Sequence, residues 1–248
     1  MPETLIIIPT YNEAENLAIL VPMLLALPLD TGVIVVDDNS QDGTGVLAER
    51  FAAEQPQRVT VIHRPRKMGL GTAYLAGFER ALREGAAFIL TMDADFSHHP
   101  RYIPAMVEMA RDGYDLVIGS RYVPGGGTPD FPLQRILLSH GANAFARFML
   151  GLQAHDTTAG FRCYRRHVLE SLPLGAIFSN GYSFLIEMLF LVQQAGFRVG
   201  ELPIVFEDRR RGKSKISRQE IVRALYTVLR LTARRLAGRH QRSGGSTS

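Results

Sequence analysis

Short apolar runs alternate with longer amphipathic segments over the first half of the chain. Nearly continuous apolar residues predict buried strands at 5–9, 33–36, 59–63, 86–92 and 115–119. Helical spacing or a helix-start signal predicts helices at 12–27, 44–54, 69–85 and from 99 onward. Strands that alternate with helices are typical of an α/β fold with a mostly parallel, doubly wound sheet.

The regular alternation stops after residue 121. A loop rich in glycine and proline leads to further predicted elements: helices at 134–150 and 183–194, a polar loop at 155–161 and a strand at 201–206. A basic cluster at 209–215 then precedes an amphipathic helix at 218–236, and residues from 244 onward are expected to be disordered. We therefore expect one domain at 1–216, followed by an amphipathic helix and a basic, partly disordered tail at 217–248.

Polar side chains follow each of the first five predicted strands. They are Thr10 to Glu13, Asp37 and Asp38, Arg64 with Arg66 and Lys67, Asp93 with Asp95, and Ser120 with Arg121. Parallel strands bring their carboxyl ends to one edge of the sheet, where ligands bind. A rim with acids, basic groups and the aromatic Tyr11 indicates a nucleotide diphosphate held together with a metal. Asp38 could accept from a base edge or a ribose hydroxyl, or either of Asp37 and Asp38 could simply cap the following helix.

The segment Asp93-Ala94-Asp95 directly follows the fourth apolar run. Side chains at positions i and i+2 of a strand point the same way, so the two carboxylates repel each other unless a cation lies between them. Ligand sets made only of oxygen suit Mg²⁺ or Mn²⁺. The segment therefore predicts a divalent metal that holds a phosphate.

Several other chemistries are excluded or disfavoured by the motifs. There is no phosphate-binding loop of the Gly-x-x-x-x-Gly-Lys-Ser/Thr type, and Gly69-x-Gly71 is an incomplete dinucleotide fingerprint. The adjacent His98 and His99 lack zinc-ligand spacing, so a structural role is expected for His98. The single cysteine, Cys163, excludes an internal disulfide and is expected to be a packing thiol in a reducing compartment.

Charge is distributed unevenly along the chain, although the net value is only +4. No acidic residue follows Glu220, whereas six arginines do: Arg223, Arg230, Arg234, Arg235, Arg239 and Arg242. Such a segment could meet an anionic membrane surface or a nucleic acid, or could be a solvated helix face. No apolar run reaches the roughly 18 residues of a membrane span, and no signal-peptide pattern opens the chain, so we expect a cytosolic protein without its own span.

Five motifs occur in order along the chain. They are IIPTYNE at 7–13, VVDDNS with DGT at 35–44, GLGTAY at 69–74, MDAD at 92–95 and GSRY at 119–122. This ordered set resembles the family 2 glycosyltransferases of the GT-A fold and, more narrowly, the polyprenol (dolichyl) monophosphate mannose synthases. The resemblance extends over residues 3–216. It implies a GT-A (Rossmann-like) fold, with a mostly parallel sheet flanked by helices and a C-terminal amphipathic helix.

The resemblance also implies roles for individual residues. Residues that match the nucleotide-holding positions are Pro9, Tyr11, Glu13, Val36 and Asp38; the donor and metal motif is matched by Asp93, Ala94 and Asp95. Arg121 matches an arginine near the diphosphate and the transferred sugar, and Arg209 and Lys215 match a loop that closes over the donor. Arg135 matches a residue that meets the acceptor phosphate, and Asp156 a motif near the reaction centre.

The metal site departs from the family pattern at one position. Some relatives carry Gln two residues after the second metal-binding Asp, whereas this chain has the shorter Ser97. The third protein ligand is therefore open between Ser97, His98 and a water. The residues expected at the reaction itself are Asp95, Arg121 and Asp156. We expect Asp156 to orient its neighbours rather than act as an obligate base, because the acceptor phosphate is already an ionised nucleophile.

The implied reaction is transfer of mannose from GDP-mannose to a polyprenyl phosphate, dependent on Mg²⁺ or Mn²⁺ and inverting. Helices 134–150 and 218–236 could lie at a membrane surface, which would place the enzyme peripherally on the cytoplasmic face. Alternatively, the apolar stripe Ile221, Leu225, Val228 and Leu229 packs on the catalytic domain, or a membrane-embedded partner subunit supplies the anchoring.

Other functions remain as alternatives. The nearest is glucose transfer from UDP-glucose to the same kind of acceptor, because base selectivity depends on fine geometry. A carbohydrate acceptor is disfavoured by the motifs at Arg135 and Asp156, and a non-catalytic nucleotide-binding regulatory module by the Asp93–Asp95 pair. Nucleic acid is not expected as a partner, because tryptophan is absent and no recognition fold appears.

Overall fold

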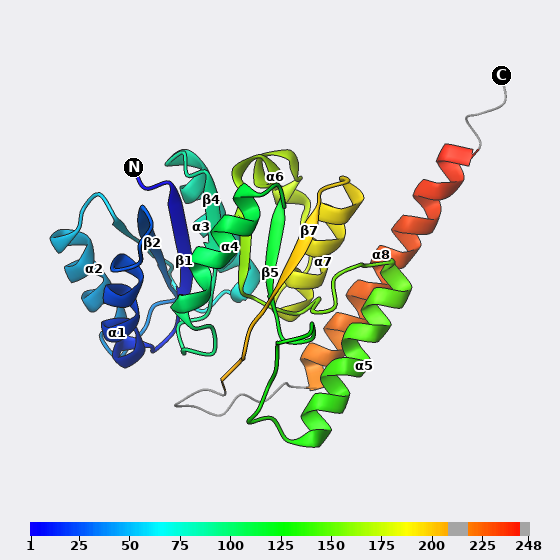
Figure 1. The fold of residues 1–248 in the computed structure, drawn as a ribbon, viewed down its shortest axis with the longest axis horizontal. Helices are drawn as coiled ribbons and strands as arrows, with labels where there is room; N and C mark the ends of the chain where they lie inside the picture. Colours follow the sequence, from blue (N-terminus) through cyan, green and yellow to red (C-terminus); the bar gives the residue numbers. More distant parts are fainter. Residues whose placement is uncertain (208–217, 244–248) are drawn as a thin grey trace.

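The protein is an α/β sandwich in which one seven-stranded sheet is flanked by helices on both faces (Figure 1). The structure is a computed structural model that describes residues 1–207 and 218–243; in the last helix it describes the side chains of residues 221–236. The strand order is β3-β2-β1-β4-β6-β5-β7. The predicted α/β class and mostly parallel sheet are confirmed.

The first half of the chain builds one side of the sheet by regular alternation. Its elements are β1 (Thr4–Thr10), α1 (Ala14–Leu25), β2 (Thr31–Asp37), α2 (Thr44–Glu54), β3 (Val59–His63), α3 (Leu70–Arg83) and β4 (Phe88–Thr91). β1 pairs in parallel with β2 from Thr4↔Thr31 to Thr10↔Asp37, and β4 lies parallel on its other side. These strands are apolar on both faces because helices cover both faces of the sheet.

The second half completes the sheet less regularly. Its elements are η1 (Pro100–Tyr102), α4 (Ile103–Arg111), β5 (Leu116–Ser120), α5 (Leu133–Leu150), β6 (Arg162–Arg165), α6 (Arg166–Ser171), η2 (Leu174–Ala176), α7 (Tyr182–Gln194), β7 (Val199–Pro203) and α8 (Arg218–Ser243). The strand predicted at 201–206 begins and ends earlier, and its last residue is Pro203. The predicted apolar helices at 134–150 and 183–194 correspond to α5 and α7.

β6 is an antiparallel strand that the sequence analysis did not predict. It lies between β4 and β5 and pairs antiparallel with both. The hydrophobic pattern conceals it, because its four residues, RCYR, begin and end with arginine. Since β6 reverses between them, β4 and β5 run in the same direction and end at the same edge of the sheet.

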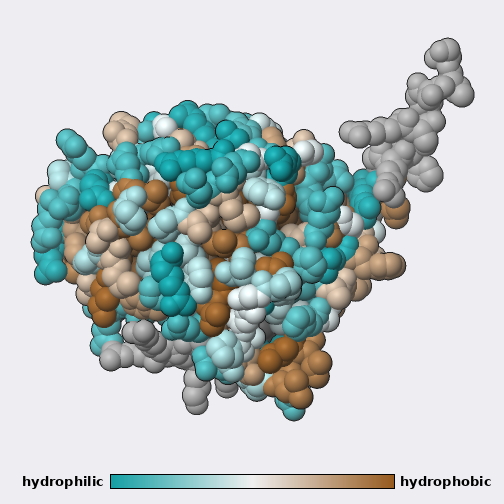
Figure 2. Space-filling model, in the orientation of Figure 1, coloured by the Kyte–Doolittle hydropathy of each residue, from teal (hydrophilic) through white to brown (hydrophobic). Residues whose placement is uncertain are grey.

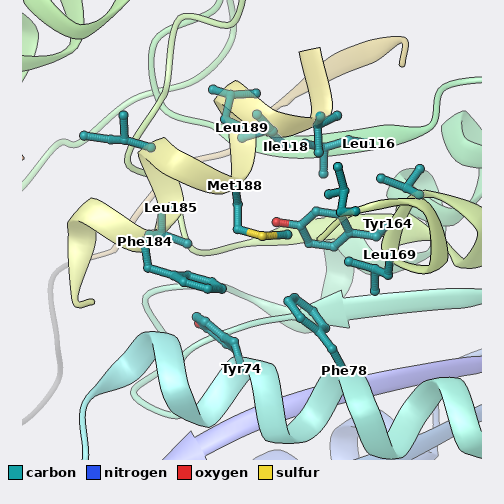
Figure 3. Packing of buried hydrophobic residues seen from close by; sticks show 14 of the residues in the cluster. Tyr74, Phe78, Leu116, Ile118, Tyr164, Leu169, Phe184, Leu185, Met188 and Leu189 are labelled. Atoms are coloured by element: carbon teal, nitrogen blue, oxygen red, sulfur yellow. The ribbon is translucent and has the colours of Figure 1, made fainter. Parts of the chain in front are cut away.

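One part of the hydrophobic core joins α3 and α7 to the face of the sheet (Figure 3). The ring of Tyr74 stacks at centroid distances of 6.3 Å from Phe78 and 6.1 Å from Phe184. Phe78 in turn meets Tyr164 of β6 edge-on at 5.4 Å. Because Tyr74 comes from α3 and Phe184 from α7, these aromatic contacts fix the two helices against each other beneath the ligand edge.

Cys163 lies in the middle of β6 and is fully buried, as the packing interpretation predicts. Burial raises the pKa of its thiol well above the ordinary value, so little reactive thiolate forms. We expect the native protein to resist iodoacetamide at mildly alkaline pH and to be fully labelled in guanidinium chloride, as read by mass spectrometry. Equal labelling rates under the two conditions would contradict the placement of this strand.

α5 and α8 lie side by side at one end of the molecule (Figure 1), and α8 also packs on α7. Of the predicted apolar stripe on α8, Val228 is buried, whereas Leu225 and Leu229 are 44% and 55% exposed. Part of the apolar stripe of α8 therefore packs on the domain, and part of it is exposed. On α5, Leu137 and Phe148 are 64% and 84% exposed.

Within the described parts of the chain, no helix combines the length and the apolar character needed to cross a membrane.

Candidate functional site

The carboxyl ends of the five parallel strands β1 to β5 bring the predicted polar residues to one edge of the sheet. Tyr11, which follows β1, is 42% exposed, and the Lys67 ammonium lies 4.4 Å from the centre of its ring. An open aromatic face beside a cation suits a base and the phosphates attached to it. Glu13 bonds through its backbone N–H to Thr44 Oγ1 at 2.9 Å, which ties the end of β1 to α2.

The two acids at the end of β2, Asp37 and Asp38, have different partners, and neither is the N-cap residue of α2, which is Gly43. Asp37 accepts from Thr10 Oγ1 at 3.0 Å and from both the backbone N–H and the hydroxyl of Ser40. Asp38 forms a buried ion pair with Arg64. Asp37 therefore fixes the turn, while Asp38 is a carboxylate oriented by a cation at the edge of the sheet.

Asp42 takes the capping role beside α2. Its carboxylate accepts from the N–H and hydroxyl of Thr44 and from the N–H of Ala14. These hydrogen bonds lower the pKa of Asp42 against the opposing effect of burial.

The segment after β4 forms a closed turn around Asp95. Asp95 is 5% exposed and accepts at Oδ1 from the backbone N–H and the hydroxyl of Ser97, at 3.1 and 2.6 Å. Phe96 between them has a φ of 64°, which a bulky residue adopts only where its surroundings enforce it, and its ring is buried in the core. His98 Nδ1 accepts from the Asp93 N–H at 3.1 Å. These hydrogen bonds and the buried Phe96 ring hold Asp93 and Asp95 in place at the edge of the sheet.

His98 has the structural surroundings predicted for it. Its ring is buried and stacks on Phe161 at 5.1 Å, with Phe206 edge-on at 5.5 Å. Burial is the main reason that the pKa of His98 is lowered, despite the nearby Asp93 and Asp95. Because the Nδ1 atom of His98 already accepts a hydrogen bond from the Asp93 backbone, this nitrogen is not free to bind a metal in this arrangement.

The donor set fits a hard divalent cation. Asp93 and Asp95 offer carboxylate oxygens, and Ser97 adds a hydroxyl oxygen next to Asp95. Within the described residues, no cluster of three or more His, Cys, Asp or Glu side chains is arranged to hold a metal. Two carboxylates completed by waters and a diphosphate match the way in which Mg²⁺ binds with its substrate.

Arg121 and Asp156 form the most elaborate ion pair at this edge. Asp156 is fully buried, and it accepts from the Arg121 backbone N–H at 3.1 Å and from Nε and Nη2 at 2.6 Å each. Thr158 Oγ1 accepts from the same Nη2 at 3.0 Å. Burial opposes the charge, but the Asp156 carboxylate raises the pKa of Arg121 above its ordinary value. Among the described residues, Nη1 of Arg121 has no hydrogen-bond partner, so this donor remains for a ligand.

Two residues that the sequence analysis missed hold the loop at 155–161, which contains Asp156. Glu201 of β7 accepts from the backbone N–H groups of His155 and Asp156 at 2.8 and 3.0 Å. Asn143 of α5 accepts from both the N–H and the hydroxyl of Thr157, at 2.7 and 2.8 Å. Asn143 is signalled in the sequence as a polar residue within an apolar helix, whereas nothing near Glu201 in the chain points to the loop 45 residues before it.

A cavity of about 170 Å³ opens from this cluster toward α5 and α8. Its polar end contains Asp93, His98, Arg121 and Arg135; its apolar end contains Leu138, Ala142, Phe145, Ile221, Leu225 and Val228. The Arg135 guanidinium lies 3.6 Å from the centre of the Phe131 ring, and Ser139 Oγ lies 2.5 Å from Tyr122 Oη. One cavity therefore joins charged groups to a hydrophobic slot between two helices.

The predicted site residues thus fall into three groups. Pro9, Tyr11, Glu13, Val36 and Asp38 lie along β1 and β2 and the loops after them, and Asp93, Ala94, Asp95 and Ser97 follow β4. Arg121 and Arg135 line the cavity, and Asp156 is buried against Arg121. Arg209 and Lys215 lie outside the described residues.

The fold and this edge define an α/β protein whose candidate ligand site lies where parallel strands end. The family model for glycosyl transferase family 2 matches residues 5–172, so the chain belongs to that family. It is 48% identical over 225 residues to the polyprenol monophosphomannose synthase of Mycolicibacterium smegmatis, an alignment that covers 91% of this chain and 85% of that protein. It is 45% identical over 226 residues to the undecaprenyl-phosphate mannosyltransferase of Micrococcus luteus, with 91% and 92% covered.

Solved structures confirm the GT-A-like fold. The glucosyl-3-phosphoglycerate synthase of Mycobacterium tuberculosis, in complex with Mn²⁺, uridine diphosphate and glucosyl-3-phosphoglycerate, matches with a TM-score of 0.64. The identity is 20%, and 94% of this chain and 80% of that chain are covered. At that identity the likeness concerns the fold alone.

Proposed function

We propose that this chain transfers mannose from GDP-mannose to a polyprenyl phosphate, forming polyprenyl phosphate mannose with inversion at the anomeric carbon. The observation that carries the proposal is the cavity that joins Asp93, Arg121 and Arg135 to a hydrophobic slot between α5 and α8. A substrate with a charged head and a long hydrocarbon chain matches both ends of this cavity. The names of the two curated relatives, a polyprenol monophosphomannose synthase and an undecaprenyl-phosphate mannosyltransferase, support the same substrate class.

The donor nucleotide is assigned to the first half of the sheet edge. Tyr11 would lie against the base, and Asp38, held by Arg64, would accept from the base edge or a ribose hydroxyl. Pro9, Glu13 and Val36 complete this part of the proposed site. Arg209 and Lys215 are proposed to close over the diphosphate.

The diphosphate and the reacting carbon are assigned to the space between Asp93 and Arg121. Asp93 and Asp95, with Ala94 between them, would hold Mg²⁺ or Mn²⁺, with Ser97 as a candidate third ligand. A divalent cation bound there offsets negative charge on the departing diphosphate. Arg121 donates from the unpartnered Nη1 toward the same charge, and Asp156 prevents its guanidinium from turning away.

The acceptor is assigned to the cavity. Arg135 would bind its phosphate, and Leu138, Phe145 and Leu225 would contact the first part of its hydrocarbon chain. The acceptor phosphate is ionised at neutral pH and needs no strong base, so Asp156 is proposed to orient Arg121 rather than to remove a proton. An oxygen of the acceptor phosphate attacks the anomeric carbon from the side opposite the diphosphate. The bond from this carbon to the diphosphate breaks, GDP leaves, and the configuration of the carbon is inverted.

The exposed apolar residues of α5 and α8 support a peripheral position on a membrane, which we propose to be its cytoplasmic face. Leu133, Leu137 and Phe148 on α5 are 70%, 64% and 84% exposed. Figure 2 shows a hydrophobic area over the beginning of α5, at the lower right of the molecule. We propose residues 1–216 as the catalytic domain and 217–248 as a separate segment made of the amphipathic helix and the basic tail, with the exposed apolar side chains of the helix facing the lipid. Flotation with anionic vesicles distinguishes direct binding from anchoring by a membrane-embedded partner subunit, which predicts no flotation of the purified chain.

A transfer assay tests the proposal. The purified protein receives labelled GDP-mannose or UDP-glucose with a polyprenyl phosphate and either Mg²⁺ or Mn²⁺. The expected result is a labelled, solvent-extractable lipid from GDP-mannose in the presence of metal. A labelled lipid only from UDP-glucose would support the glucosyl alternative, and tight nucleotide binding without transfer would support a regulatory module.

Filling the slot provides a test of the acceptor assignment. Ala142 lines the cavity, whereas Ala144, two residues along the same helix, does not. We expect A142F to raise the KM for the lipid by about tenfold or more, because overpacking excludes the chain, and to leave donor binding unchanged. The variant A144F controls for the added ring. Equal KM values for the two variants would contradict the assignment.

A further inference from the structure

Arg162 is a fully buried arginine, at the first position of β6. It pairs with Thr91 of β4 on one side and with Ile118 of β5 on the other. It therefore stands between the strand that leads to Asp93 and the strand that leads to Arg121. No carboxylate pairs with its guanidinium among the residues that the structure describes.

The guanidinium of Arg162 is directed at backbone carbonyl groups instead. Nη2 donates to the Thr157 oxygen at 3.0 Å and Nε to the Ala159 oxygen at 2.8 Å. Nη1 donates to the Leu185 oxygen in α7 at 2.8 Å. Burying a guanidinium without a counter-ion costs free energy. An arginine at this position therefore suggests a role that outweighs the cost of its burial.

The contacts alternate along the loop. The carbonyls of residues 157 and 159 face Arg162, while the side chains of Asp156 and Thr158 face Arg121. The loop is thus held between two arginines, one buried beneath it and one at the site. The rigid fork of Arg162 sets the positions of the two carbonyls, and these in turn set the two groups that hold Arg121.

We propose that Arg162 is a positioning residue for the transfer reaction: through the 156–159 loop it fixes the guanidinium of Arg121 where charge develops on the leaving diphosphate. This inference rests on the proposed function. It goes beyond the predicted site, because Arg162 does not line the cavity and, in the part of the chain that the structure describes, has no hydrogen bond to a residue proposed to bind substrate.

The test compares R162K with R58K. Lysine keeps the charge but cannot reach three carbonyls at once. Arg58 is a matched control, because its Nε and Nη2 donate to the Thr31 and Leu25 carbonyls at 2.8 Å each, at the opposite edge of the sheet. We expect R162K to lower kcat by about 100-fold, the cost of misplacing a catalytic group by roughly 1 Å, with little change in the KM for GDP-mannose. R58K should keep the wild-type kcat.

A double-variant comparison separates positioning from general destabilisation. If Arg162 acts through Arg121, then R162K lowers kcat much less in an R121K background than in the wild type. T91V is a milder second variant, because it removes only the 2.7 Å hydrogen bond from Thr91 Oγ1 to the carbonyl of Gly160, the residue directly after the 156–159 loop. T91V should lower kcat less than R162K does. If R162K does not fold, T91V takes its place in the test.

Hydrogen exchange supplies a readout that needs no substrate. In R162K, or in T91V if R162K does not fold, the amide of Arg121, which donates to Asp156 Oδ2, should exchange faster than in R58K. A wild-type chain that transfers no mannose overturns the proposed function, and the exchange rates then decide whether the loop is braced. If the wild-type chain transfers mannose, full kcat in R162K, or in T91V where R162K does not fold, overturns this inference alone.

Discussion

Replacing Arg121 with lysine is expected to lower kcat for lipid mannosylation by about 100- to 1,000-fold, the range found when one preorganised donor to a developing charge is lost. Arg121 is held by Asp156 through Nε and Nη2, each at 2.6 Å, and by Thr158 through Nη2. A lysine has one ammonium, which can either pair with Asp156 or reach the diphosphate, but cannot do both in this geometry. The KM for the donor should change much less, because the lost contact strengthens as the bond to the diphosphate breaks.

R111K is the matched control for R121K. Arg111 pairs with Glu3 at 2.7 Å on an exposed surface, and exposed pairs contribute little to stability. We expect R111K to retain wild-type kinetics. An R121K enzyme within a few-fold of the wild-type kcat would show that the Arg121–Asp156 pair is structural.

The second large effect is expected for Asp95. D95N should lower metal-dependent transfer by about 100-fold or more, since a carboxylate ligand is replaced by a neutral amide that offers a metal less negative charge. The fold should survive, because an amide oxygen can still accept from the Ser97 N–H and hydroxyl that now bond to Asp95 Oδ1. Titration with Mn²⁺ followed by electron paramagnetic resonance measures the metal directly, without turnover.

D115N controls for the loss of one carboxylate elsewhere. Asp115 precedes β5 at the opposite edge, where it bonds to His167 and to the backbone N–H of Arg198. Mn²⁺ affinity in the presence of GDP should fall in D95N and remain unchanged in D115N. Equal affinity in the two variants would remove Asp95 from the metal site.

The sequence predicted the site best where chemistry directly follows a strand. Asp93, Asp95 and Arg121 follow apolar runs, so their arrival at one edge of the sheet could be inferred from the parallel topology. The pairing of Arg121 with Asp156, 35 residues away, could not, because it depends on how the 155–161 loop crosses the sheet. The direction of β6 depends in the same way on pairing between distant segments rather than on local pattern.

The two helices beside the cavity show a different limit. Their apolar spacing identified them as helices, but spacing does not say which apolar side chains face protein and which face outward. In α8, Val228 is buried while Leu229, the next residue, is 55% exposed. Only the packing of α8 against α5 and α7 separates these roles.

Mass spectrometry of the lipid recovered from a reaction with GDP-mannose and polyprenyl phosphate tests the central claim most directly. The account predicts a product heavier than the acceptor by one hexose unit joined through the phosphate and formed with an equal amount of GDP. At low lipid concentration A142F should form this product about tenfold more slowly. Recovery of unmodified lipid, with the mannose released as free sugar or transferred to a water-soluble acceptor, would contradict the account.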